Sequence, residues 1–190
     1  LPAENFIPLP EGMDWKNNAA EIGVICDAIA TPLKVTRKAR VMPTDTVAVI
    51  GAGGGLGVHM LMVSRWAHAR KVIAVDTRAS KFESCLKSGA DATIDATDGK
   101  VSEQLIEMTG GFGVDVVFDP VGGEVFENSM RCIAWGARLL VIGFTGGIGL
   151  ARHVACLKLQ LAATPFDFHA MNVEHARSFV SVSVSVGLFA

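Results

Sequence analysis

The pattern of hydrophobic and polar positions becomes regular at residue 46 and alternates from there between two kinds of segment. Short runs of apolar, mostly β-branched residues are typical of strands buried on both faces of a sheet. They occur at 46–50, 71–75, 92–94, 114–118 and 138–142. Helical stretches lie between them, at 58–69, 80–88, 101–109 and 124–135. Strands and helices that alternate in this way form right-handed βαβ units, so we predict an α/β fold with a doubly wound parallel sheet.

The residues before this region predict two short helices. Ala19 to Ile29 is apolar and fits a helix that ends before Pro32, because the residue preceding a proline disfavours helical backbone. A second helix is expected from Leu33 to Val41, with its basic side chains on a solvated face. Residues 1–17 are polar and contain several prolines, which favours an extended entry segment.

The pattern weakens after about residue 150. Residues 157–163 could form a sixth strand. Valine alternates with serine at 179–186, which suits either an edge strand or a ragged tail. We therefore expect the sheet domain to span residues 18–165 and an irregular tail to follow at 166–190.

Composition and charge narrow the classes of protein. Half of the 190 residues are hydrophobic and 19% are charged, as in a globular domain with a large core. The formal net charge of −2 gives no electrostatic reason to expect nucleic acid or an anionic membrane as a partner. No apolar run approaches the roughly 18 residues that a membrane span requires. The four cysteines form no CxxC pair, so a reducing cytoplasm is the expected compartment, with Cys85, Cys132 and Cys156 in the core.

The turn Gly51-Ala52-Gly53-Gly54-Gly55-Leu56-Gly57 links the first predicted strand to a helix. A dinucleotide site needs such a turn, because backbone N–H groups and the helix N-terminus must face the pyrophosphate without an intervening Cβ. The spacing that ends where the helix begins is Ala52-x-Gly54-x-x-Gly57. We therefore expect Gly53, Gly54, Gly55 and Leu56 to contact a dinucleotide.

Asp76 stands at the end of the second predicted strand, 19 residues beyond Gly57. A carboxylate at this place accepts hydrogen bonds from the adenine-ribose hydroxyls and identifies a Rossmann dinucleotide site. It repels a 2′-phosphate, so NAD(H) is favoured over NADP(H). Arg78 and Lys81 are also candidate cofactor residues, and since a nearby cation can pair with a phosphate they keep NADP open.

Two later strand ends face the crevice where ligands bind in open α/β sheets. One is Asp119-Pro120-Val121-Gly122-Gly123 and the other is Gly143-Phe144-Thr145-Gly146-Gly147. Both are rich in glycine, which allows a backbone to come close to a ligand or simply to make a tight packing turn. Because both lie at one edge of the sheet, we favour a ligand crevice and expect Asp119, Pro120, Val121, Gly143 and Phe144 to line it.

The glycine turn is followed along the chain by Asp76 with Lys81, by Gly89-Ala90-Asp91 and by residues 119–123. This ordered set resembles the cofactor domain of the medium-chain dehydrogenase/reductase superfamily, which includes zinc alcohol dehydrogenases and zinc-free quinone oxidoreductases. Residues 2–12 also resemble the segment that leaves that superfamily's GroES-like catalytic domain. The resemblance covers roughly residues 1–165 and implies a fragment from which the catalytic domain is largely absent.

The resemblance implies an NAD(P)-dependent oxidoreductase that transfers hydride between nicotinamide and a small alcohol, aldehyde or ketone. Cys26 falls near the place of a zinc ligand in zinc-dependent members, with Asp27 as an alternative, although a lone cysteine on an apolar helix is more often a core residue. Thr31 resembles a threonine that lies near the nicotinamide and is the candidate catalytic residue. In this superfamily an edge strand often pairs across a homodimer, and residues 157–163 are the corresponding stretch here. The resemblance therefore implies a possible homodimer, with an edge exposed by truncation as the alternative.

Single residues argue against two other classes of protein with a similar pattern of strands and helices. Short-chain dehydrogenases need a catalytic tyrosine, and the chain has no tyrosine. A methyltransferase usually carries a carboxylate where this chain has Val49. Two alternatives stay open: a binding module that holds the dinucleotide without chemistry, and a zinc-free quinone or enoyl reductase. No substrate-positioning apparatus is evident, so the stretch by itself is expected to bind cofactor weakly and to be inactive.

Overall fold

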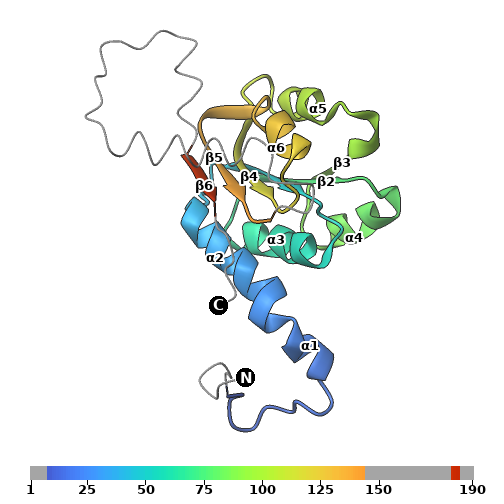
Figure 1. Ribbon diagram of the computed structural model, residues 1–190, viewed down its shortest axis with the longest axis vertical. Coiled ribbons are helices and arrows are strands. Elements are labelled where there is room, and N and C mark those ends of the chain that lie inside the picture. The colour runs from blue at the N-terminus through green and yellow to red at the C-terminus, as the bar shows by residue number, and fades with distance from the viewer. Residues whose placement is uncertain (1–7, 144–180, 185–190) are drawn as a thin grey trace, which may run out of the picture.

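The computed structural model describes residues 8–143 and 181–184. At its centre lies a six-stranded parallel sheet with the order β3-β2-β1-β4-β5-β6 (Figure 1). The strands are β1 (Thr46–Ile50), β2 (Lys71–Asp76), β3 (Ala92–Asp95), β4 (Val114–Asp119), β5 (Ile133–Val141) and β6 (Ser181–Val184). The chain starts in the middle of the sheet and extends it first to one side and then to the other. This order confirms the predicted doubly wound Rossmann fold.

Helices cover both faces of the sheet (Figure 1). Alternate residues of each strand point to opposite faces, so Val47 and Val49 pack with α2, α3 and α4, whereas Ala48 and Ile50 pack with α5 and α6. The helices after β1 are α3 (Gly55–Trp66), α4 (Phe82–Lys87), α5 (Val101–Met108) and α6 (Glu124–Ser129), with short turns η3 (Ala79–Lys81) and η4 (Ala96–Asp98). Within the described ranges, none of the helices is long and apolar enough to cross a membrane.

The break expected before Pro32 is wrong. The N-terminal segment runs as α1 (Ala19–Gly23), a π-helical stretch η2 (Ile25–Ile29) and α2 (Ala30–Ala39), and Pro32 lies buried inside α2. In the π-helical stretch the Ile29 N–H reaches back to the Val24 carbonyl at 3.1 Å, one residue further than in an α-helix. This wider turn directly before the proline accommodates a ring that would otherwise clash with the preceding helical turn.

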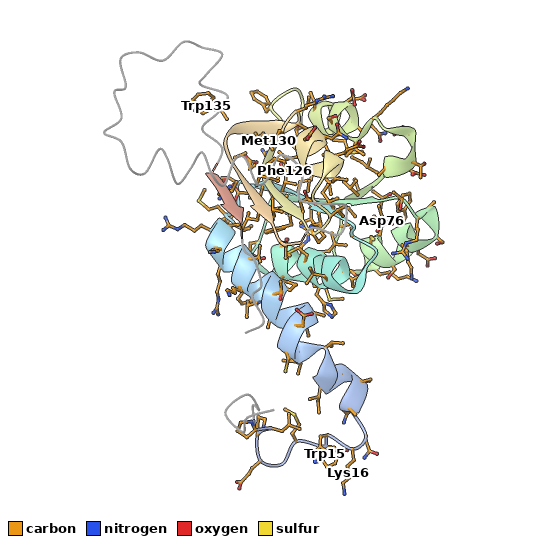
Figure 2. All side chains as sticks on the ribbon, in the orientation of Figure 1. Trp15, Lys16, Asp76, Phe126, Met130 and Trp135 are labelled. Carbon is orange, nitrogen blue, oxygen red and sulfur yellow. The ribbon has the colours of Figure 1, made fainter. Side chains whose placement is uncertain are left out.

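The boundary between α6 and β5 also differs from the prediction, since the helix ends earlier and the strand begins earlier. Val114 of β4 pairs with Ile133, yet Val116 pairs with Arg138, so extra residues of β5 bulge out between these two pairs. Gly136, with φ of +72°, makes the bend, and Trp135 beside it is 73% exposed. Figure 2 shows Trp135 at the margin of the molecule. Apolar spacing alone could not reveal this irregular start of the strand.

Of the C-terminal residues 144–190, the structure describes four, and they test part of the prediction. Ser181–Val184 forms β6, which pairs in parallel with β5 at the edge of the described sheet. Of the two alternatives for 179–186, the edge strand is therefore the one observed, within a segment that we expected to be an irregular tail. The strand predicted at 157–163 lies outside the described residues, as does Cys156. Cys85 and Cys132 are buried, which confirms their expected place in the core.

Candidate functional site

The glycine turn between β1 and α3 is tight and internally hydrogen bonded. Gly51 turns the chain with a φ of +63°, which glycine adopts without steric cost. The Ala52 N–H donates to the Val75 carbonyl and the Gly54 N–H donates to the Gly51 carbonyl, each at 3.1 Å. Gly54 then caps α3 in extended conformation. The predicted spacing began at Ala52 and therefore missed Gly51, the residue that makes the turn.

Two glycines of the turn are needed for packing and one faces open space. A Cβ on Gly57 would collide with the Gly51 carbonyl oxygen and would lie 2.6 Å from the Cα of Ala52. A Cβ on Gly53 would lie 2.6 Å from the Cβ of Lys81. At Gly55, the first residue of α3, nothing lies within 4 Å of such an atom. The start of α3 thus packs closely against the glycine turn at Gly57 and is open at Gly55, as an anion site at a helix N-terminus requires.

Asp76 joins this turn to the end of β2, where Figure 2 labels it. Its Oδ2 accepts a hydrogen bond of 2.7 Å from the Gly53 N–H, and its Oδ1 accepts one of 2.9 Å from the Arg78 N–H. The side chain is only 5% exposed, and the Arg78 Nε lies 3.6 Å from Oδ1. The sequence predicted Asp76 as a ligand of the ribose. The structure adds a second role, because the carboxylate fixes the backbone of the glycine turn.

The turn after β4 is organised by Asp119 in a similar way. Its Oδ1 accepts hydrogen bonds from the Val121 N–H at 2.8 Å and from the Gly122 N–H at 2.9 Å. The side chain is fully buried, and in the described part of the chain its Oδ2 has no hydrogen-bond partner. Burial raises the pKa of the Asp119 carboxyl, while the two backbone hydrogen bonds oppose that rise.

The raised pKa of Asp119 predicts a pH dependence of stability. The folded chain holds this proton to higher pH than the unfolded chain, so the free energy of unfolding falls as pH rises from the unfolded to the folded pKa. An Asp119→Asn variant lacks this titration. Urea unfolding from about pH 4 to about pH 8 should therefore show the wild type losing stability relative to D119N as the pH rises. Parallel pH profiles of the two proteins would refute it.

The turns after β1 and β4, two of the three predicted to share one edge of the sheet, meet there. A Cβ on Gly51 would lie 3.7 Å from Pro120 Cγ and 3.8 Å from Val121 Cγ2. Of the third turn the structure describes Gly143, where a Cβ would lie 2.6 Å from the Pro120 carbonyl oxygen, so the backbone at Gly143 is in direct contact with the turn after β4. Leu56, Pro120 and Ile142 border a narrow apolar recess at this edge. The place of the predicted crevice is thus the carboxyl ends of β1 and β4, where the strand order reverses.

The Gly89-Ala90-Asp91 motif serves the fold rather than the crevice. The Arg65 guanidinium on α3 donates to the Gly89 carbonyl and pairs with Asp91 at 2.6 Å. The other oxygen of Asp91 accepts a hydrogen bond of 2.7 Å from the Val72 N–H. The motif therefore ties α3 to β2 and helps to hold the helix whose N-terminus borders the crevice.

Cys26 and Thr31, two further predicted site residues, lie on the N-terminal helical segment, outside this group of turns. Cys26 is exposed on η2, so the expectation that it is a core residue is wrong. Thr31 donates its Oγ1 hydrogen to Asp27 at 3.0 Å. In the described ranges, no three or more metal-ligating side chains converge on a point. Phe144 lies beyond the described residues. The roles of Cys26 as a zinc ligand and of Thr31 in catalysis stay predictions.

The sheet, its strand order and the glycine turn define a Rossmann-type α/β domain with a crevice at the carboxyl ends of its strands. The sequence profile of the zinc-binding dehydrogenase family matches residues 55–165, more than half of the chain. The chain belongs to this family, and its resemblance to the medium-chain dehydrogenase/reductase superfamily is thereby confirmed.

Individual relatives agree with this assignment. Quinone oxidoreductase-like protein 2 of Rattus norvegicus is 35% identical over 115 residues, which are 60% of this chain and 33% of that protein. Quinone oxidoreductase of Pseudomonas aeruginosa is 30% identical over 149 residues, covering 77% of this chain and 44% of that protein. The crystal structure of a 2-haloacrylate reductase superposes with a TM-score of 0.72 at 25% identity, over 97% of this chain and 51% of that one. The chain spans about a third to a half of the length of these relatives.

Proposed function

We propose that this chain is the cofactor-binding part of an NAD(P)-dependent oxidoreductase that transfers hydride between nicotinamide and an alcohol, aldehyde or ketone. The observation that carries the proposal is the Asp76–Gly53 hydrogen bond of 2.7 Å. It places a carboxylate at the end of β2 directly beside a glycine turn whose Gly55 faces open space. A ribose-binding acid and a pyrophosphate-binding helix N-terminus need this juxtaposition. Membership of the zinc-binding dehydrogenase family supports the same conclusion.

In this proposal the two halves of the dinucleotide bind on the two sides of β1. The backbone N–H groups at Gly55 and Leu56 bind the pyrophosphate at the N-terminus of α3, where Gly54, whose own N–H is used within the turn, caps the helix. Asp76 binds the adenine ribose at the end of β2. Pro120, Val121 and Gly143 border the nicotinamide half beyond β4 and β5. When bound, nicotinamide supplies or accepts the hydride, and these residues orient it.

The same proposal extends to the domain organisation. Residues 18–165, together with β6 of the same sheet, form the dinucleotide-binding domain, and residues 1–17 enter it from a catalytic domain that contains most of the substrate site. Cys26 and Thr31 lie between residues 1–17 and β1, and are therefore close in sequence to that catalytic domain. A homodimer formed through the edge of the sheet stays part of the proposal.

The activities named for several relatives favour a second candidate activity for this chain. Two are quinone oxidoreductases or similar to one, and another is a 2-haloacrylate reductase. A zinc-free quinone or enoyl reductase uses the same hydride chemistry on a different substrate. The two activities differ in the domain that completes the substrate pocket, and the cofactor site argued from Asp76 and Gly55 is common to both.

Asp76 is proposed to favour NAD(H) over NADP(H), and the Asp76→Asn variant tests this. The asparagine oxygen can still accept the Gly53 N–H, but the negative charge that repels a 2′-phosphate is gone. We expect the affinity for NADPH relative to NADH to rise about tenfold, which corresponds to about 1.4 kcal/mol. Asparagine has one oxygen and cannot also accept the Arg78 N–H, but this local loss affects both cofactors alike, so the ratio of the two dissociation constants isolates the charge.

Calorimetric titration of the wild type and of D76N with NADH and NADPH gives this ratio directly. Arg78→Gln is the matched control, because the Arg78 side chain is exposed and carries the positive charge next to Asp76. It should lower the relative affinity for NADPH if Arg78 pairs with the phosphate. An unchanged ratio in D76N would show that Asp76 does not read the ribose.

A further inference from the structure

Asp119 is placed where it cannot touch a ligand. Its side chain has no exposed surface, and Phe118 beside it is equally buried. Oδ1 is occupied by the Val121 and Gly122 N–H groups, and Oδ2 is enclosed without a partner among the residues that the structure describes. A buried polar atom left without a partner is costly, so its presence calls for an explanation outside simple stability.

What Asp119 holds is the turn that faces the crevice. The Asp119 carbonyl accepts a 2.8 Å hydrogen bond from the Ile142 N–H, which joins the turn to the end of β5. Pro120 and Val121 then lie in van der Waals range of the place of a Cβ on Gly51. The Asp119 side chain holds this turn from its buried side, and Pro120 and Val121 form the partly exposed side of the turn.

The local chain cannot keep this shape unaided. Gly122 and Gly123 follow with φ of +69° and +60°, and two consecutive glycines are the most flexible pair that a turn can contain. Asp119 accepts two hydrogen bonds from the backbone of this turn, one from each of two successive residues. Removing the carboxyl group would therefore loosen the turn while leaving the strands on either side in place.

The position of the turn says which part of a dinucleotide it would meet. Asp76 ends β2, on one side of β1, so the adenosine half lies toward β2 and β3. The turn after β4 lies on the other side of β1, and a dinucleotide that crosses the sheet at β1 brings its second half there. We infer that Asp119 is a positioning residue for the nicotinamide half of the cofactor, acting through the backbone of residues 120–122. This inference rests on the proposed dinucleotide-binding function.

The test compares NADH with ADP-ribose, which contains the adenosine half and the pyrophosphate but no nicotinamide. Calorimetric titration of the Asp119→Ala variant should show NADH binding weakened about tenfold, the equivalent of one or two lost hydrogen bonds. ADP-ribose binding should stay within about twofold of the wild type. Asp119→Asn retains an acceptor for both N–H groups, and we expect it to restore NADH affinity to within about threefold.

Asp115→Ala is the matched control. It lies on the same strand, and its Oδ2 accepts the Thr46 N–H at 2.7 Å, but at the opposite end of the sheet. It should cost stability without changing either affinity. Equal losses of NADH and ADP-ribose in D119A, or no loss of NADH, would overturn the role of Asp119. A wild-type chain that binds neither ligand would instead overturn the proposed function itself.

A measurement on the wild type keeps the inference testable if D119A does not fold. In amide NMR spectra, NADH should shift the Val121 and Gly122 N–H resonances, whereas ADP-ribose should leave them in place. Both ligands should shift the Gly55 and Leu56 resonances, which report the pyrophosphate. Shifts of Val121 and Gly122 that are the same with both ligands would contradict the inference.

Discussion

Replacing Gly57 by alanine should destabilise the folded chain by about 3 kcal/mol or more, at the upper end of what overpacking usually costs. The new methyl group would collide with the Gly51 carbonyl oxygen and lie 2.6 Å from the Cα of Ala52. Both are backbone atoms of the turn that joins β1 to α3, so neither can rotate away as a side chain would. The helix would have to move off the sheet and give up buried contacts of Met60 and Leu61.

Gly55 supplies the control for this prediction. It lies only two residues earlier in α3, but nothing is within 4 Å of a Cβ built there. Even the larger Gly55→Val change should therefore alter the free energy of unfolding by less than about 1 kcal/mol. Urea denaturation followed by circular dichroism measures both variants. A Gly57→Ala protein as stable as Gly55→Val would mean that α3 does not pack against the turn as described.

The Arg138→Met variant should lose about 3 kcal/mol of stability, as expected when one partner of a buried ion pair is removed. Arg138 on β5 pairs with Asp45 at 2.7 Å, and the Asp45 side chain is only 4% exposed. The guanidinium also donates to the carbonyl oxygens of Ala39 and Arg40, at 2.9 and 3.0 Å. One cation thus satisfies a buried carboxylate and closes the C-terminal end of α2. Methionine fills much of the same volume but leaves the carboxylate buried and unpaired.

Arg70→Met is the matched control, because Arg70 lies at the same edge of the sheet and makes one hydrogen bond of 3.0 Å to Thr46 Oγ1. Its side chain is exposed, so the loss should stay below about 1 kcal/mol. Chemical denaturation of both variants measures the difference. If Arg138→Met and Arg70→Met cost the same, the contact between Arg138 and α2 does not contribute to stability in the way that the geometry implies.

The core strands could be predicted because parallel strands buried on both faces must be continuously apolar. Thr46–Ile50 is such a run, and the structure places all five of its residues in the interior. The boundaries that failed depend on contacts remote in sequence or on local irregularity. Pro32 stays helical because a π-helical turn precedes it, and β5 begins early because Val114 pairs with Ile133 before the bulge at Gly136. Neither feature has a hydrophobic period that sequence reasoning could recognise.

The candidate site shows the same division. The spacing between the glycine turn and Asp76 predicted that they would meet, since the carboxyl ends of adjacent parallel strands share one edge. What spacing could not show is how each carboxylate is used. Asp76 and Asp119 both accept backbone N–H groups from the turns beside them, and these hydrogen bonds depend on the folded backbone. A glycine pair beginning three residues after an acid, as at 119–123, is the one signal in the sequence of such a clamp.

The turn at 51–57 is proposed to bind the pyrophosphate of a nicotinamide dinucleotide at its open face. Calorimetric titration of the wild type and of Gly55→Val with NADH tests this proposal most directly, because nothing lies within 4 Å of a Cβ at this residue and the added side chain occupies the place proposed for the pyrophosphate. Gly55→Val should unfold like the wild type and bind NADH at least about tenfold more weakly. Unchanged NADH affinity in a Gly55→Val protein of normal stability would contradict it.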